Sequence, residues 1–192
     1  MIKRIGVVHG RFQPLHLGHF YDYILLAKKE CDFLYIGLTN YDSTRKIESK
    51  TNPHRIKREN NPLNFYERLN IIKETIINED YNNKIQYNSF DIIPFPIELP
   101  RIINNFVPKE AIHYLTIFDD WGREKLDELK GEGLNVKVLF EKTLKEKKIS
   151  STMVRDKIVE GGGWQNLVPN SVVPYLNEWK IRDRLIESRK FK

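Results

Sequence analysis

Short apolar runs rich in β-branched residues alternate along the chain with longer segments in which apolar residues recur every three or four positions. The first pattern is typical of buried strands and the second of helices. The predicted strands are Ile2–His9, Phe33–Leu38, Ile85–Phe90, Ala111–Phe118 and Val136–Phe140. The predicted helices are Gly18–Lys29, Phe65–Asn78, Trp121–Lys130, Thr152–Glu160 and Val172–Arg189. This alternation predicts an α/β fold with a doubly wound parallel sheet of about five strands and flanking helices.

Glycines mark the ends of several of these helices. Gly131 and Gly133 follow one predicted helix, and Gly161–Gly163 follow another. Glycine is common where the chain leaves a helix because it readily adopts the left-handed backbone that ends the helical hydrogen bonding. Ser171 stands where it can cap the last helix, and Pro174 lies in the first turn of that helix, where proline is tolerated.

The size and composition of the chain indicate one soluble domain. A chain of 192 residues without an internal repeat or linker is predicted to form a single domain, 1–192, whose C-terminal part, about 150–192, is helical. No apolar stretch approaches the ~18–20 residues that a membrane span requires. The segment Met1–Val8 has the character of a strand and lacks the features of a signal peptide, and Cys31 is the only cysteine, so we expect a cytoplasmic protein.

The formal net charge of +6 is compatible with binding either nucleic acid or small anions such as triphosphates. Between Asn40 and Asn64 lies a polar stretch that is too long for an ordinary strand-to-helix connection, and such loops often bind ligands. Its basic residues include Arg45, Lys46, Lys50, Arg55, Lys57 and Arg58. A solvated loop explains this cluster equally well. No aromatic-interleaved basic motif accompanies it, so a nucleic-acid partner is not expected.

The strongest chemical motif follows the first predicted strand and reads Gly10-Arg11-Phe12-Gln13-Pro14-Leu15-His16-Leu17-Gly18-His19. It places His16 and His19 three residues apart where a helix begins. The carboxyl end of the first strand is where open α/β sheets bind ligands, and a helix N-terminus offers free N–H groups to phosphate. Gly10 lets the backbone approach a ligand closely, and Gly18 gives room between the two imidazoles.

Histidine suits phosphoryl-type transfer because it donates hydrogen bonds to phosphoryl oxygens and can be cationic near neutral pH. Such transfer mainly needs positioning and charge stabilisation, so no nucleophilic side chain is required. His16 and His19 are therefore the predicted catalytic residues, and a structural histidine in a turn is the alternative. The rest of the motif is predicted to line the nucleotide site through Gly10, Arg11, Phe12, Gln13 and Gly18. A protein-bound metal is not predicted, because the sequence holds no HExxH or CxxC motif.

A second motif lies far along the chain and reads Ile149-Ser150-Ser151-Thr152-Met153-Val154-Arg155. Serine or threonine at this predicted helix start can cap the helix, while free N–H groups and the Arg155 guanidinium can bind phosphate oxygens. The predicted anion site therefore comprises Ile149, Ser150, Ser151, Thr152 and Arg155. An ordinary capped helix with a surface arginine explains this stretch alone equally well.

Together these segments resemble a known family. The pattern Gly10-Arg11-Phe12-Gln13-Pro14-x-His16-x-Gly18-His19 resembles the signature of archaeal-type nicotinamide-nucleotide adenylyltransferases, within the HxGH nucleotidylyltransferase superfamily. Ile149–Arg155 resembles the ISSTxxR motif of that superfamily, which holds the β- and γ-phosphates. Asn61–Arg68 and Trp164–Val173 resemble two further segments of the archaeal-type branch. The resemblance covers nearly the full length and implies a Rossmann-like fold and a homo-oligomer.

The resemblance implies transfer of AMP from ATP, bound with Mg²⁺, to nicotinamide mononucleotide (NMN), which releases pyrophosphate and forms NAD. It implies that His16 and His19 stabilise the changing phosphate charge. It also implies that Ser151, Thr152 and Arg155 hold the β- and γ-phosphates. A cytidylyltransferase acting on a phosphorylated alcohol or phosphonate shares both motifs and is the main alternative. A non-catalytic nucleic-acid-binding protein is the alternative of another class.

The middle of the chain departs from the archaeal-type pattern, which offers an acidic residue and a tryptophan to the nicotinamide ring. The segment Pro94–Pro108 has no tryptophan, and Glu98 and Phe106 are the candidate substitutes. Where the family has a Gly-Asn segment after the next strand, this chain has Asp119 and Trp121. Trp121 can either stack on a base or acceptor or pack at a helix start. We place Asp119 and Trp121 in the nucleotide site, and the identity of the acceptor stays open.

Overall fold

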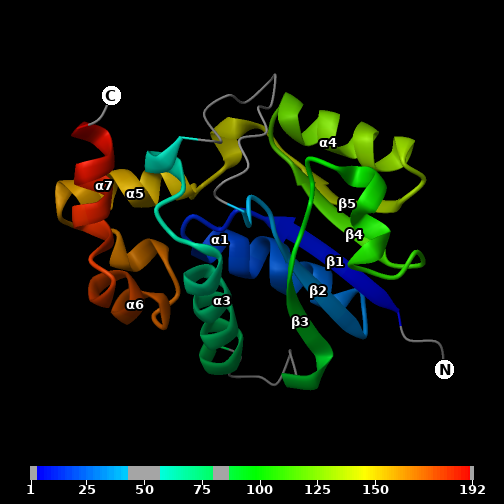
Figure 1. The fold of residues 1–192 in the computed structure, drawn as a ribbon, viewed down its shortest axis with the longest axis horizontal. Helices are drawn as coiled ribbons and strands as arrows, with labels where there is room; N and C mark the ends of the chain where they lie inside the picture. The colour runs from blue at the N-terminus through cyan, green and yellow to red at the C-terminus, as the bar shows by residue number, and fades with distance from the viewer. Residues whose placement is uncertain (1–3, 43–56, 80–86, 191–192) are drawn as a thin grey trace.

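A parallel sheet forms the centre of the computed structural model, which describes residues 4–42, 57–79 and 87–190 (Figure 1). The five strands in these residues follow the order β3-β2-β1-β4-β5. They are β1 Ile5–Gly10, β2 Phe33–Leu38, β3 Phe90–Pro94, β4 Ile112–Ile117 and β5 Asn135–Glu141. The chain builds outward from β1 to β3 and then returns to β4 on the other side of β1. Doubly wound sheets bind ligands at such a switch point, at the carboxyl ends of the strands.

Helices cover both faces of the sheet, and α4 packs against β4 and β5. The helices are α1 Leu17–His19, α2 Leu25–Lys29, α3 Phe65–Glu79, α4 Asp120–Gly131, α5 Ser151–Glu160, α6 Val172–Glu178 and α7 Ile181–Lys190. A π-helical turn, Phe20–Ile24, joins α1 to α2. Short 3₁₀ turns lie at Arg58–Asn60, Tyr87–Ser89, Pro100–Asn105, Leu144–Glu146 and Gln165–Leu167. None of the helices in the described ranges is long and apolar enough to cross a membrane.

Two apolar clusters hold the helices against the sheet. There is one on each face, because successive strand residues point to opposite faces of the sheet. On one face, Val8 belongs to a cluster with Ile72 of α3 and Val154 of α5. On the other face, Val7 packs in a second cluster with Leu129 of α4. Each fully buried aliphatic side chain contributes about 1.5–3 kcal/mol. The C-terminal helices α5 to α7, which gather on one side of the molecule in Figure 1, therefore share a core with the sheet.

The third strand lies later in the chain than the pattern predicts. The predicted strand Ile85–Phe90 overlaps the observed strand only at Phe90, because β3 spans Phe90–Pro94 and residues 87–89 form a 3₁₀ turn. Residues 85–86 lie outside the described ranges. Pairing with β2 runs from Leu34 opposite Phe90 to Leu38 opposite Pro94. As an edge strand, β3 tolerates a terminal proline, which cannot donate a hydrogen bond to the sheet.

The predicted last helix is two helices. Lys180 has a left-handed backbone with φ of 51° and separates α6 from α7. The break turns the chain so that α6 packs on α3 while α7 packs on α5, and both helices bury apolar side chains. The predicted cap was also wrong: the Ser171 side chain makes no capping hydrogen bond and instead bonds to the Thr75 hydroxyl at 3.1 Å. By contrast, Gly161 ends α5 with φ of 94°, as its position predicts.

Candidate active site

Buried side chains stabilise the turn after β1. Phe12 has a left-handed backbone with φ of 48°, and its buried ring fills the space beside Gly10, where an added Cβ would lie 3.0 Å from the ring. The Gln13 side chain makes two hydrogen bonds with the backbone of Leu63, at 2.8 and 3.0 Å. Phe12 and Gln13 therefore shape the turn, and their direct contact with a ligand stays a prediction.

The two histidines lie together at the start of α1. His16 is 2% exposed, and its Nδ1 atom accepts a hydrogen bond from the backbone N–H of His19 at 3.2 Å. The two imidazoles are stacked, with ring centroids 3.6 Å apart and planes inclined by 19°. A Cβ atom on Gly18 would lie 3.2 Å from the His16 ring, which agrees with the prediction that Gly18 gives the imidazoles room.

The hydrogen bond at Nδ1 determines where His16 carries its proton. Since Nδ1 accepts, the neutral ring carries its proton on Nε2, and within the described part of the chain that buried Nε2 has no hydrogen-bond partner. Burial, followed by the charge of Lys147, lowers the pKa of His16 to about 3. Burial also lowers the pKa of His19 well below its usual value, with smaller contributions from His16, Lys147 and Arg11. With these lowered pKa values both imidazoles are neutral at pH 7, although histidine can be cationic near neutral pH.

A third histidine, His113 on β4, is 0% exposed, and in the described ranges neither ring nitrogen has a hydrogen-bond partner. Its ring lies 6.0 Å from that of Phe95, and burial lowers the pKa of His113 to about 4. Because His16 and His113 bind protons more readily when the chain is unfolded, acid favours unfolding from pH 6.5 downward until these folded-state pKa values are reached.

We therefore expect the free energy of unfolding to fall by about 2 kcal/mol for each of these two histidines between pH 7.5 and 5. Urea denaturation at a series of pH values measures this loss. In His113→Leu, the slope of stability against pH is expected to decrease by the contribution of one histidine. An unchanged slope in that variant would contradict a buried neutral His113.

The second motif begins α5 and contacts the first. The Ser150 hydroxyl caps the helix by accepting a hydrogen bond from the backbone N–H of Met153 at 3.2 Å, which confirms the predicted cap. The Ser151 hydroxyl donates to the carbonyl of Pro14 at 3.1 Å. Ile149 packs against the larger apolar cluster. The start of α5 is thus fixed beside the turn that carries the histidines, although the two lie far apart in the sequence.

Arg155 is buried, so the alternative of a surface arginine is wrong. Its Nη1 atom donates to the carbonyl of Gln13 at 2.8 Å. Its Nη2 atom donates to Asn60 Oδ1 at 2.7 Å and to the Thr152 hydroxyl at 3.2 Å. The guanidinium therefore links the two motifs, and a direct contact of Arg155 or Thr152 with phosphate stays a prediction.

Lys147 is a site residue that sequence reasoning missed. Its Nζ atom lies 4.9 Å from the centroid of the Phe118 ring, and its charge acts on both His16 and His19. Burial lowers the pKa of Lys147, while the Asp119 carboxylate opposes this shift. A lysine two positions before the predicted anion-binding motif Ile149–Arg155 is a usable signal, but the lysine-rich composition concealed it.

The residues after β4 lie at the start of α4. The Asp119 side chain caps this helix by accepting a hydrogen bond from the backbone N–H of Gly122 at 2.9 Å. Its charge also acts on Lys147, which in turn acts on His16 and His19, so the structure brings Asp119 near the two histidines. Trp121 is half-buried in the first turn of α4, and stacking on a base stays a prediction.

The aromatic side chains of the middle segment belong to the core. Phe95 is 0% exposed and stacks on His9, with ring centroids 4.7 Å apart. Phe106 packs against the second apolar cluster, and Glu98 is half-buried. Phe95 is therefore unavailable for stacking on a ligand, and the roles of Phe106 and Glu98 as substitutes stay predictions.

Other candidate features lie elsewhere. Of the basic cluster in the long loop, Lys57 and Arg58 are exposed, and the remaining members lie outside the described ranges.

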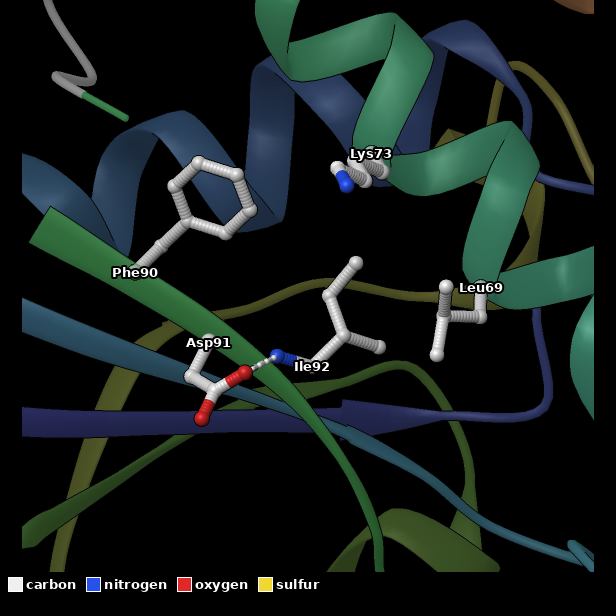
Figure 2. Close-up of a pocket in the computed structure, with 5 residues that line it drawn as sticks. All are labelled: Leu69, Lys73, Phe90, Asp91 and Ile92. Atoms are coloured by element: carbon white, nitrogen blue, oxygen red, sulfur yellow. Dashed lines mark hydrogen bonds between the residues drawn. The ribbon is translucent and has the colours of Figure 1, made fainter. Parts of the chain in front are cut away.

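A pocket of about 280 Å³ lies between α3 and β3, as Figure 2 shows, and contains none of the predicted site residues. It is lined by Leu69, Lys73, Phe90, Asp91 and Ile92. In the described ranges, no group of three or more His, Cys, Asp or Glu residues is arranged to hold a metal ion.

Comparison with protein families gives a match that spans both motifs. The cytidylyltransferase-like family model matches residues 7–157, from β1 to the middle of α5. The chain belongs to this family. It is a nucleotidyltransferase, and the predicted enzyme class is confirmed.

Relatives of this family member align over nearly all of its length. A phosphonoformate cytidylyltransferase of Streptomyces viridochromogenes is 37% identical over 184 residues, which cover 96% of each chain. A nicotinamide-nucleotide adenylyltransferase of Thermococcus kodakarensis is 28% identical over 189 residues, 96% of this chain and 88% of that protein. A nicotinamide-nucleotide adenylyltransferase of Methanococcus maripaludis is 29% identical over 178 residues, 88% of this chain and 86% of that protein. The resemblance to archaeal nicotinamide-nucleotide adenylyltransferases is confirmed.

Solved structures share the fold. The nicotinic acid mononucleotide adenylyltransferase of Plasmodium falciparum, complexed with NaAD, has a TM-score of 0.56 at 13% identity and covers 95% of this chain and 98% of its own. A putative nicotinate-nucleotide adenylyltransferase of Vibrio parahaemolyticus has a TM-score of 0.55 at 16% identity, over 92% and 100% of the two chains. At these identities the likeness concerns the fold, and the predicted Rossmann-like α/β architecture is confirmed.

Proposed function

We propose that the protein transfers a cytidylyl group from CTP to a small phosphonate or phosphate acceptor that carries a further negative charge, and releases pyrophosphate. The observation that carries this proposal is the 37% identity with a phosphonoformate cytidylyltransferase over 96% of both chains. The nicotinamide-nucleotide adenylyltransferase of Thermococcus kodakarensis is only 28% identical over a similar length. This preference reverses the one that the combined resemblance of the sequence motifs implied, which was ATP with NMN.

The described side chains support a small acceptor without an aromatic ring. The segment Pro94–Pro108 has no tryptophan. Both of its phenylalanines contribute to the core, Phe95 against His9 and Phe106 in the second cluster. A nicotinamide ring would lose a stacking partner worth roughly 1–3 kcal/mol, by analogy with base–aromatic stacking. A small phosphonate with a carboxylate needs no such partner and is attracted by the positive charge of the chain.

In the proposed reaction, a phosphonate or phosphate oxygen of the acceptor attacks the α-phosphorus of CTP, and the bond between the α-phosphorus and the bridging oxygen breaks. The Nε2–H of His16 donates to the transferred group, and Lys147 and the start of α5 bind the leaving pyrophosphate. Such a reaction depends on positioning and charge stabilisation. Mg²⁺ would arrive with the nucleotide and would neutralise phosphate charge, and Asp119, beside Lys147, is the carboxylate that would help to hold it.

Adenylyl transfer from ATP to NMN is the second candidate. It is supported by the Gly10–His19 motif and by archaeal relatives that are 28% and 29% identical. Trp121 at the start of α4 is the aromatic residue that this reaction would use for stacking. The homo-oligomer that the resemblance implies stays a prediction.

Pyrophosphate release from each pair of CTP or ATP with phosphonoformate, a phosphorylated alcohol or NMN tests the proposal. We expect the highest kcat/KM for CTP with phosphonoformate. A higher kcat/KM for ATP with NMN would support the second candidate instead. A His16→Ala preparation, purified in the same way, controls for contaminating enzymes.

A further inference from the structure

Arg68 on α3 is a buried cation whose hydrogen bonds go to the main chain. It is 1% exposed. Its Nη1 atom donates to the carbonyls of Arg11 and Thr39, at 3.0 and 2.7 Å. Its Nη2 atom donates to the carbonyl of Asn40 at 2.9 Å, and Nε donates to that of Asn64 at 3.2 Å. Burial lowers the pKa of Arg68 to about 10, so the guanidinium stays charged at neutral pH.

Three of the carbonyls that Arg68 binds, those of Arg11, Thr39 and Asn40, belong to two unusual turns at the ends of neighbouring strands. The first turn follows β1 and contains Phe12, with φ of 48°. The second follows β2 and contains Asn40, with φ of 50°. Residues other than glycine adopt this left-handed backbone rarely; asparagine tolerates it better than most, and phenylalanine needs its surroundings to enforce it. A hydrogen bond of 3.0 Å from the Thr39 N–H to the Gly10 carbonyl places the two turns side by side.

The two turns serve different halves of the reaction, if the proposed function holds. The first turn leads into His16 and lies beside Lys147, where the triphosphate is proposed to bind. In-line displacement requires the attacking oxygen to approach opposite the leaving pyrophosphate. Lys147 follows β5, and β2 lies on the other side of β1 from β4 and β5, so we expect the acceptor at the end of β2. There the Thr39 hydroxyl is 1% exposed and has no hydrogen-bond partner within the described ranges.

We propose that Arg68 is a positioning residue for the transfer reaction, which fixes the turn at Phe12 relative to the turn at Asn40 and so aligns the acceptor with the α-phosphorus. This inference rests on the proposed function. One guanidinium can span both turns because its donors form a rigid planar fork. A misplacement of ~1 Å between reacting groups can cost 10²-fold in rate. Arg68 thus acts on catalysis through the backbone that it holds.

The Arg68→Lys variant keeps the positive charge but loses the planar set of N–H donors that spans both turns. We expect kcat to fall by ~10²-fold and the KM for the acceptor to rise, while the KM for the triphosphate changes by less than about threefold. Arg184→Lys is the matched control, because Arg184 forms an ion pair at 2.7 Å with Glu67, next to Arg68, and also donates to the Pro62 carbonyl, which lies outside both turns. Wild-type kinetics are expected for this control. Unchanged kcat in Arg68→Lys, or equal changes in both KM values, would overturn the proposal.

A second pair of variants tests the same idea if Arg68→Lys does not fold. Asn40→Gly accepts the left-handed backbone freely, whereas Asn40→Ala strains it. We expect Asn40→Gly to keep near wild-type kcat and Asn40→Ala to lower kcat with little change in the KM for the triphosphate. Equal kcat for the two variants would overturn the proposal.

Amide hydrogen exchange separates this inference from the proposed function. If the wild-type protein releases no pyrophosphate with any substrate pair, the proposed function fails. The positioning of the turns is then measured by exchange in residues 10–13 and 39–42, in Arg68→Lys and in Arg184→Lys. Faster exchange in both segments of Arg68→Lys alone supports the role of Arg68 in holding the turns. Unchanged exchange in Arg68→Lys overturns it.

Discussion

Replacing His16 with alanine is expected to lower kcat by ~10²–10³-fold, the usual cost of removing one preorganised donor to a developing phosphoryl charge. His16 is suited to this role because Nδ1 is occupied by the His19 N–H and the proton is therefore carried on Nε2. The dissociation constant of the triphosphate is expected to change much less, since a donor that acts on the transition state contributes little to ground-state binding. Steady-state pyrophosphate release and equilibrium nucleotide binding measure the two effects separately.

Two comparisons make the His16 result specific. His19→Ala is expected to lower kcat in the same way, because its ring stacks on that of His16. His113→Ala removes a buried histidine elsewhere in the sheet and is expected to lower stability while kcat stays near that of the wild type. Near-normal turnover in folded His16→Ala would assign that histidine a purely structural role.

Replacing Lys147 with methionine is expected to raise the KM for the triphosphate by roughly 10–100-fold, because a charge-assisted contact contributes about 1.5–3 kcal/mol. A second effect follows from the electrostatics. The charge of Lys147 contributes to the low pKa values of His16 and His19, so removing this charge raises both values. The acid side of the pH–rate profile is therefore expected to move to higher pH.

Lys148→Met is the matched control, because Lys148 is the adjacent lysine and its side chain is exposed. This control variant is expected to keep the wild-type KM and the wild-type pH profile. If Lys147→Met and Lys148→Met behave alike, Lys147 does not belong to the triphosphate site.

Local sequence patterns predicted the elements that place the site. The turn at Gly10–His19 was identifiable because a buried strand, a glycine and a histidine pair follow one another directly. The cap at Ser150 was identifiable for the same reason, since capping is decided within a few residues. The edge strand β3 and the break at Lys180 were not, because both depend on which distant surfaces the segments bury.

The supporting arginines and Lys147 depend on long-range contacts. Arg155 was predicted to bind phosphate, with a surface arginine as the alternative, and no role was predicted for Arg68; both are buried against carbonyls of the turn after β1. Arg155 is 142 positions from its partner Gln13, and Arg68 is 57 from Arg11. No local periodicity encodes such pairs. The two buried arginines bind carbonyls of the turn that leads into His16 and His19, and Arg155 also links this turn to α5.

Product analysis of a competition reaction tests the central claim most directly. Equal concentrations of CTP and ATP are incubated in one mixture with phosphonoformate, NMN and Mg²⁺, and the products are identified by mass spectrometry. Cytidylyl transfer to a small phosphonate predicts that the adduct of CMP with phosphonoformate dominates and that NAD forms in trace amounts at most. NAD as the main product, with no cytidylyl adduct, would contradict it.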